Sequence, residues 1–223
     1  EGRAIFSNLK KVVYFLLSAN VSEVLVMFFG FLFFGALGEP LLATQLLWIN
    51  LVTDGLPALA LGIDAPVPGL MEQSPDERRD ILSVPHQLRL LWQGAFLAAG
   101  ALGALVWAHY VREADWEYVR TLVFTTLVTA QLAHIYNVRA QGTSVWKIGF
   151  GGNSVLSWGV LLSLALHLVV VYTPLGNRLF ETVPVDLVDW LAVAVLTVIP
   201  FLGVDAVKRA TFRKHPNRST ARD

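Results

Sequence analysis

The chain has 223 residues, of which 55% are hydrophobic and only 15% are charged, whereas soluble domains carry about 25% charged residues. Its formal net charge is zero, so bulk charge gives no support for binding to nucleic acid. The lack of cysteine excludes disulfides, thiolate metal sites and cysteine nucleophiles. The composition therefore indicates a membrane protein whose chemistry relies on oxygen and imidazole groups.

The hydrophobic residues gather into stretches of about twenty, the length at which a helix crosses roughly 30 Å of hydrocarbon. We expect an all-α membrane protein, a bundle of six transmembrane helices with a broken second helix, in one membrane domain over residues 1–223. The predicted spans are, in chain order, 12–35, 41–63, 88–110, 119–137, 155–173 and 187–207.

The distribution of basic residues predicts the orientation. Fourteen of the 17 Lys and Arg residues fall on the side of the two termini, and the opposite loops hold only Arg112, Arg120 and Arg178. By the positive-inside rule both termini are cytoplasmic. Loop 64–87, rich in proline and charge, is then the one substantial cytoplasmic connection. We expect a multi-pass protein in contact with membrane lipid, and the short loops favour a bacterial plasma membrane.

The start of the chain differs from that of a secreted precursor. It begins with Glu1 and no methionine, and the first hydrophobic stretch has no small-residue cleavage site. We therefore expect a segment of a longer protein without a signal peptide.

Polar residues within the first span share a helical face. Residues 18–23 read Ser-Ala-Asn-Val-Ser-Glu, so Asn20 and Glu23 are three positions apart. An ionisable residue at membrane depth is costly unless it faces a partner or a cavity. Glu23 is therefore a candidate functional residue.

The second span carries a similar group. Asn50, Thr53 and Asp54 are spaced to share one face, and Gly55 and Pro57 follow directly. Proline removes a backbone donor and glycine tolerates unusual dihedrals, so we expect the helix to be kinked or partly unwound around Asp54. Broken helices at membrane depth are tolerated where they line a cavity or an ion path.

Together these residues form a set of hard oxygen donors without sulfur, which suits calcium better than zinc or copper. Manganese and magnesium remain alternative ions. Two other interpretations stay open: a polar network that only joins two helices, and a proton path through the carboxylates. For His134 and His167, which lie in apolar stretches, we expect a hydrogen-bonded packing role rather than a ligand or relay role.

The same residues carry a family resemblance. Residues 1–5 and 18–23, and above all residues 45–58, Gln-Leu-Leu-Trp-Ile-Asn-Leu-Val-Thr-Asp-Gly-Leu-Pro-Ala, resemble the fifth and sixth transmembrane helices of type II P-type ATPases, most closely the sarcoplasmic-reticulum-like calcium pumps. Residues 71–75 and 81–83 continue it more weakly. The six spans then correspond to helices five to ten, so the resemblance covers the whole chain in topology but only about its first 85 residues in motifs.

The resemblance implies a set of calcium ligands. In that family the fifth helix supplies an asparagine and a glutamate, and the sixth an asparagine, a threonine and an aspartate that bridges two calcium sites. A glutamate of the eighth helix completes one site, and residues 127–131, Leu-Val-Thr-Ala-Gln, have glutamine there. This departure lowers the negative charge and puts a second ion in doubt. The implied ligands here are Asn20, Glu23, Asn50, Thr53, Asp54 and Gln131.

Sodium and potassium exchange is disfavoured, because pumps of that type have an aspartate where this chain has Asn50.

The resemblance also implies parts that this chain lacks. It has no Asp-Lys-Thr-Gly-Thr sequence, so by itself it is not expected to hydrolyse ATP. The implied partners are the first four helices and the actuator, phosphorylation and nucleotide domains of the same pump, which would bind ATP and magnesium. The alternatives are a free-standing six-helix channel or carrier, a non-hydrolysing accessory subunit, and a pump for manganese or protons.

Overall fold

The computed structural model describes residues 2–65, 84–140 and 143–213. All regular elements within these ranges are helices, which confirms the all-α class. Most of loop 64–87 and the end of the basic tail lie outside the described residues. The elements are α1 Gly2–Phe34, α2 Ala43–Trp48, the π-helical segment η1 Ile49–Thr53, α3 Gly55–Gly62, α4 Val84–Val106, the π-helical segment η2 Trp107–Val111, α5 Trp116–Arg139, α6 Val145–Ile148, α7 Ser154–Tyr172, α8 Pro174–Phe180 and α9 Leu187–Arg213.

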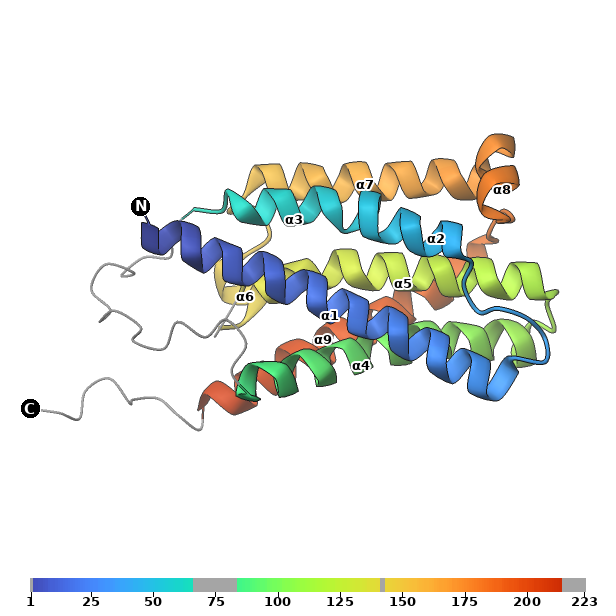
Figure 1. Ribbon diagram of the computed structural model, residues 1–223, viewed down its shortest axis with the longest axis horizontal. Coiled ribbons are helices and arrows are strands. Elements are labelled where there is room, and N and C mark those ends of the chain that lie inside the picture. Colours follow the sequence, from blue (N-terminus) through green and yellow to red (C-terminus); the bar gives the residue numbers. More distant parts are fainter. Residues whose placement is uncertain (1, 66–83, 141–142, 214–223) are drawn as a thin grey trace, which may run out of the picture.

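The long helices run along one common direction and form a bundle (Figure 1). Four of them are long and apolar enough to cross a membrane: Ala4–Phe34, His86–Val111, Ser154–Tyr172 and Leu187–Ala210. They correspond to the first, third, fifth and sixth predicted spans. The start of α1 and the end of α9 lie at the same end of the bundle, as an even number of crossings requires (Figure 1).

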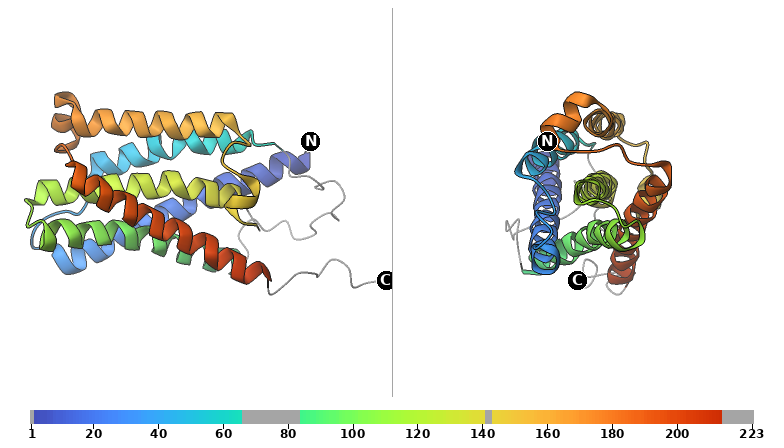
Figure 2. Two further views of the ribbon diagram at one scale, coloured as in Figure 1. Left: turned by 180° about the vertical axis from the view of Figure 1, so that it is seen from behind. Right: turned by 90° about the vertical axis from the view of Figure 1, so that its right-hand side faces the viewer.

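The other two predicted spans differ from these four. Residues 41–63 are divided among α2, η1 and α3, none of which is long enough to cross by itself. Residues 119–137 fall within α5, whose sequence contains several threonines, a glutamine, a histidine and an asparagine. Figure 2 shows why this composition is tolerated: seen along the bundle, α5 is the central helix and the others surround it. A helix surrounded by protein does not need an apolar face toward lipid.

The core is built around α5. Its Leu122, Phe124 and Leu127 are fully buried, and they belong to one cluster with Ala101 and Ala104 of α4. Small residues let helices approach closely in membrane proteins. At Gly94 of α4 an added Cβ would lie 2.5 Å from Val21 Cγ1 and 2.9 Å from the Ser18 carbonyl oxygen of α1, so only glycine permits this approach of α4 to α1.

Candidate cation-binding site

The second predicted span is interrupted at the expected position. The buried side chain of Gln45 accepts a hydrogen bond from the Leu42 backbone N–H at the start of α2 and donates one to the Phe180 carbonyl oxygen. The backbone then widens into η1. There the Asp54 N–H donates to the Ile49 carbonyl oxygen at 2.9 Å, the hydrogen bond to the fifth preceding residue that defines a π-helix. The predicted irregularity around Asp54 is confirmed as a π-helical segment, a form that is frequent at functional sites.

Pro57 explains why an α-helical ladder does not run through this region. It has no N–H to donate to the Thr53 carbonyl oxygen four residues earlier. The ladder of α3 starts again with the Ala58 N–H, which bonds to the Asp54 carbonyl oxygen at 3.0 Å. Asp54 therefore lies at the junction of η1 and α3, where the backbone has left regular α-helical geometry.

Glu23 of α1 is the residue at which three segments meet. It is 6% exposed. The Asn50 side-chain amide donates to Glu23 Oε2 at 2.8 Å, and the Gln131 amide donates to Glu23 Oε1 at 3.2 Å. The Gln131 amide also reaches Ser22 Oγ at 3.4 Å. The structure thus brings together candidate ligands from α1, η1 and α5 that lie far apart in the sequence.

Asp54 and Thr53 complete the buried part of the site. Both are fully buried. The Thr53 hydroxyl donates to the Ile49 carbonyl oxygen at 2.8 Å, which leaves its lone pairs available. Both carboxylate oxygens of Asp54 are buried, and neither has a hydrogen-bond partner among the described residues. A buried carboxylate without a donor is costly, so Asp54 has the character expected of a cation ligand.

Asn20 is the candidate that the structure does not bring into this cluster. It is exposed on α1, and no hydrogen bond within the described residues joins it to Glu23, although the two are three positions apart. Three residues turn an α-helix to a direction about 60° away from the starting side chain, so one residue can be buried while the other is not. Asn50 is also exposed, although its side-chain amide reaches Glu23.

Both intramembrane histidines make hydrogen bonds to hydroxyl groups. Ser18 Oγ donates to the Phe15 carbonyl oxygen and lies within hydrogen-bond distance, 3.2 Å, of His134 Nε2. His167 Nε2 lies 3.2 Å from Thr125 Oγ1. These contacts agree with the packing role expected for both. Ser18 and Ser22, which contact His134 and Gln131, are not among the predicted ligands, although their four-residue spacing places both on one face of α1.

The set offers hard oxygen donors, because it contains two carboxylates, two amides and a hydroxyl. Within the described part of the chain, no three His, Asp or Glu side chains lie together as a group that could hold a metal ion. In the present arrangement the amides of Asn50 and Gln131 direct N–H groups at Glu23. Turning each amide by half a turn would present its oxygen, the atom type that a hard cation prefers.

Comparison with known proteins identifies the family. Residues 38–210 match the family described as "Cation transporting ATPase, C-terminus". A calcium-transporting ATPase of Bacillus subtilis is 37% identical over 90% of this chain, and calcium-transporting ATPase 1 of Bacillus cereus is 30% identical over 94%. A probable calcium-transporting ATPase of Trypanosoma brucei brucei is 30% identical over 82%.

The chain spans only 22%, 25% and 20% of the lengths of these three relatives. The family match nevertheless covers most of its residues, from just before α2 to near the end of α9, whereas α1 precedes the matched range. The described helices include four long apolar segments, as an integral membrane region requires. The chain therefore belongs to the cation-transporting P-type ATPases and corresponds to their C-terminal membrane region.

Proposed function

We propose that this chain forms the ion-binding membrane part of an ATP-driven pump that transports calcium by alternating access. The longer protein is called the parent pump below. The observation that carries the proposal is Asp54, fully buried at a helix break, with neither carboxylate oxygen hydrogen-bonded to any described residue. The names of the relatives add calcium as the ion. We assign cation binding to Asn20, Glu23, Asn50, Thr53, Asp54 and Gln131.

We also propose that the chain crosses the membrane six times and that both termini are cytoplasmic. The interrupted segment α2 to α3 and the more polar helix α5 extend alongside the four long apolar helices (Figures 1 and 2). Four of the six candidate ligands, Asn50, Thr53, Asp54 and Gln131, lie on them, so the interruption and the polar residues are features that a cation path needs. The basic residues on the side of the termini support the cytoplasmic assignment.

The exposure of two asparagines supports the proposal that another part of the parent pump covers this surface. Asn20 and Asn50 lie within predicted spans, yet both are exposed. Hydrocarbon cannot hydrogen-bond to an amide, so lipid is a poor covering for this surface. Upstream helices of the parent pump would cover it and add further oxygen ligands, while the cytoplasmic domains of the parent would bind ATP with magnesium and form the aspartyl phosphate.

The test is calcium-dependent phosphorylation of the parent pump by labelled ATP in native membranes. Wild type should give an acid-stable, hydroxylamine-sensitive phosphoprotein only when calcium is present, and Asp54→Asn should abolish it. Asp186→Asn is the matched control, because Asp186 lies in an exposed ion pair with Arg112. Unchanged calcium-dependent labelling of Asp54→Asn would overturn the assignment of the site.

The same assay distinguishes the alternative ions and classes. We expect calcium to support labelling at lower concentration than manganese, and the reverse order would change the proposed ion. Labelling that needs no divalent cation and increases with acidity would favour a proton pump. A native protein of the size of this chain, never labelled by ATP, would favour a channel, carrier or accessory subunit.

A further inference from the structure

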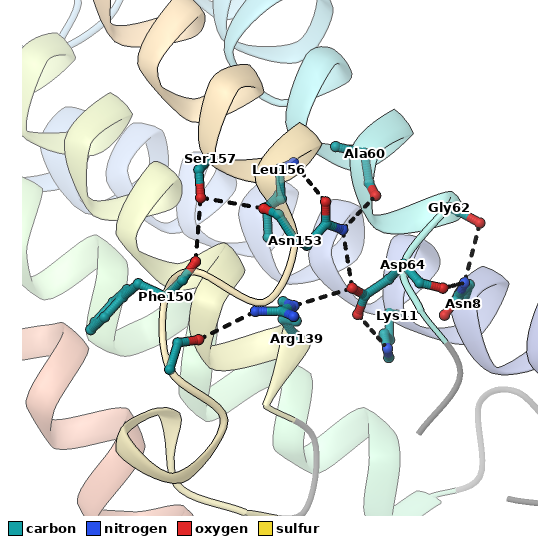
Figure 3. A network of polar contacts seen from close by, with 11 residues as sticks. Asn8, Lys11, Ala60, Gly62, Asp64, Arg139, Phe150, Asn153, Leu156 and Ser157 are labelled. Atoms are coloured by element: carbon teal, nitrogen blue, oxygen red, sulfur yellow. Dashed lines mark hydrogen bonds and ion pairs between the residues drawn. The ribbon is translucent and has the colours of Figure 1, made fainter. Parts of the chain in front are cut away.

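Another buried carboxylate, that of Asp64, lies just beyond the end of α3, where four helices meet (Figure 3). Lys11 Nζ of α1 is 2.8 Å from Asp64 Oδ2, and Arg139 Nε of α5 is 3.2 Å from Asp64 Oδ1. The three side chains are between 2% and 8% exposed. Two buried cations therefore depend on one buried anion.

Two asparagines complete this arrangement. Asn153, the N-cap residue of α7, donates to Asp64 Oδ1 at 3.0 Å and to the Ala60 carbonyl oxygen at 3.2 Å. Asn8 of α1 donates to the carbonyl oxygens of Asp64 at 2.7 Å and Gly62 at 3.3 Å. We call the set Asn8, Lys11, Asp64, Arg139 and Asn153 the Asp64 clamp.

The Asp64 clamp connects the helices that carry the candidate cation ligands. Each of its charged residues lies on a segment that carries a candidate ligand, or directly after such a segment. At 1.5 Å per helical residue, the charged residue is about 12 to 18 Å along the chain from that candidate ligand. No clamp residue belongs to the candidate ligand set. The corresponding pairs are Lys11 with Glu23, Asp64 with Asp54, and Arg139 with Gln131.

Electrostatics makes the Asp64 clamp resistant to rearrangement. Burial raises the pKa of Asp64, but the Lys11 hydrogen bond and charge, the Arg139 charge and the Asn153 hydrogen bond together lower it more, so the pKa lies below its ordinary value. Asp64 is thus an anion at neutral pH. A shift of α1 away from α3 would leave buried charges without partners, which is strongly unfavourable.

We propose that Asp64 is a positioning residue for the cation site, an inference that rests on the proposed transport function. The Asp64 clamp joins one end of α1, α3 and α5, so the relative positions of Glu23, Asp54 and Gln131 depend on it. Movement of α1 at this end is then transmitted to the other ligand-bearing helices. Loss of the clamp loosens this relation and weakens calcium binding without removing any ligand.

The test measures the calcium concentration for half-maximal phosphorylation of the parent pump. Asp64→Asn and Lys11→Gln should each raise it by about fivefold or more, the lower part of the usual range for coupled sites. Lys11→Gln retains the Arg139 to Asp64 pair and so perturbs folding less. Asp64→Glu should restore a value close to wild type.

Glu181→Gln is the matched control. It removes a 2.8 Å ion pair with the buried Arg120, and it should leave the calcium concentration for half-maximal phosphorylation unchanged. Glu181 directly follows α8, which lies at the opposite end of the bundle from the start of α1 (Figure 1). A wild-type calcium concentration for folded Asp64→Asn and Lys11→Gln would overturn the proposal. If Asp64→Asn cannot be recovered, Lys11→Gln decides by the same criterion.

Asp54→Asn, assayed alongside, separates this inference from the proposed function. If Asp54→Asn abolishes labelling while the clamp variants behave as wild type, the clamp proposal alone fails. If Asp54→Asn retains calcium-dependent labelling, the proposed cation site fails, whatever the clamp variants do.

Discussion

The side-chain amide of Asn50 donates a 2.8 Å hydrogen bond to the Glu23 carboxylate and joins η1 to α1. The Gln131 amide occupies the other carboxylate oxygen from α5. Both oxygens of Glu23 therefore accept amide N–H groups in this arrangement. A cation that binds to Glu23 has to displace these donors, and it can gain their amide oxygens as ligands when they turn.

Asn50→Ala should weaken calcium binding by the parent pump. The substitution removes one amide oxygen from the proposed ligand set, and we expect this loss to outweigh the hydrogen bond to Glu23 that the cation no longer has to displace. We expect the calcium concentration for half-maximal phosphorylation to rise about tenfold or more, where tenfold corresponds to about 1.4 kcal/mol. Asn177→Ala in α8, which loses a hydrogen bond to the Thr182 carbonyl oxygen, is the control. If the calcium concentration for half-maximal phosphorylation is the same for both variants, Asn50 does not belong to the ligand set.

Gln131→Glu should strengthen calcium binding. It places a third carboxylate beside Glu23, and calcium affinity increases with the charge of the ligand set. We expect the calcium concentration for half-maximal phosphorylation to fall by about tenfold, or about 1.4 kcal/mol. Equilibrium binding of radioactive calcium to the purified parent pump also gives the number of ions, which the resemblance leaves open. A weaker affinity would indicate that repulsion between Glu23 and the new carboxylate dominates.

Acid should weaken the Asp64 clamp. The folded-state pKa of Asp64 lies below its ordinary value of 3.8, so its stabilisation is present above that value and is lost as the pH falls through the lower folded-state pKa. The charged groups that face it, Lys11 and Arg139, are both cations. When the pH is lowered from about 6 to about 3 in detergent, the thermal unfolding temperature should fall more for wild type than for Asp64→Asn. Parallel curves for the two proteins would contradict this.

Gly94→Ala should destabilise the contact between α1 and α4. The added methyl group would lie 2.5 Å from Val21 Cγ1 and 2.9 Å from a backbone oxygen of Ser18, so the helices must separate. Overpacking of this kind costs about 1–3 kcal/mol, and we expect a lower thermal unfolding temperature. Gly62→Ala is the control, because nothing lies within 4 Å of its added Cβ. A temperature for Gly94→Ala equal to that of the control would show that α4 can shift without cost.

Hydropathy located the four long apolar helices, because the length and composition of a span are local properties of the sequence. The predicted ends agree within a few residues except at the start of the first span, which was predicted at residue 12 and begins at Ala4. The break near Asp54 was also readable, since Gly55 and Pro57 act on their own backbone. The sequence did not predict that the break is a π-helical segment, because a π-helical segment and a simple kink satisfy the same local constraints. The family resemblance came from a continuous motif at residues 45–58, which needs no tertiary structure.

The tertiary structure decided which polar residues meet. Spacing alone assigned Asn20 and Glu23 to one face of α1, yet the packing of α5 and η1 buries Glu23 and leaves Asn20 exposed. The central position of α5 explains its polar residues, which are tolerated because surrounding helices replace lipid. The Asp64 clamp joins residues separated by more than fifty positions. Contacts of this kind depend on how helices pack, and helix packing is not encoded in the periodicity of any single helix.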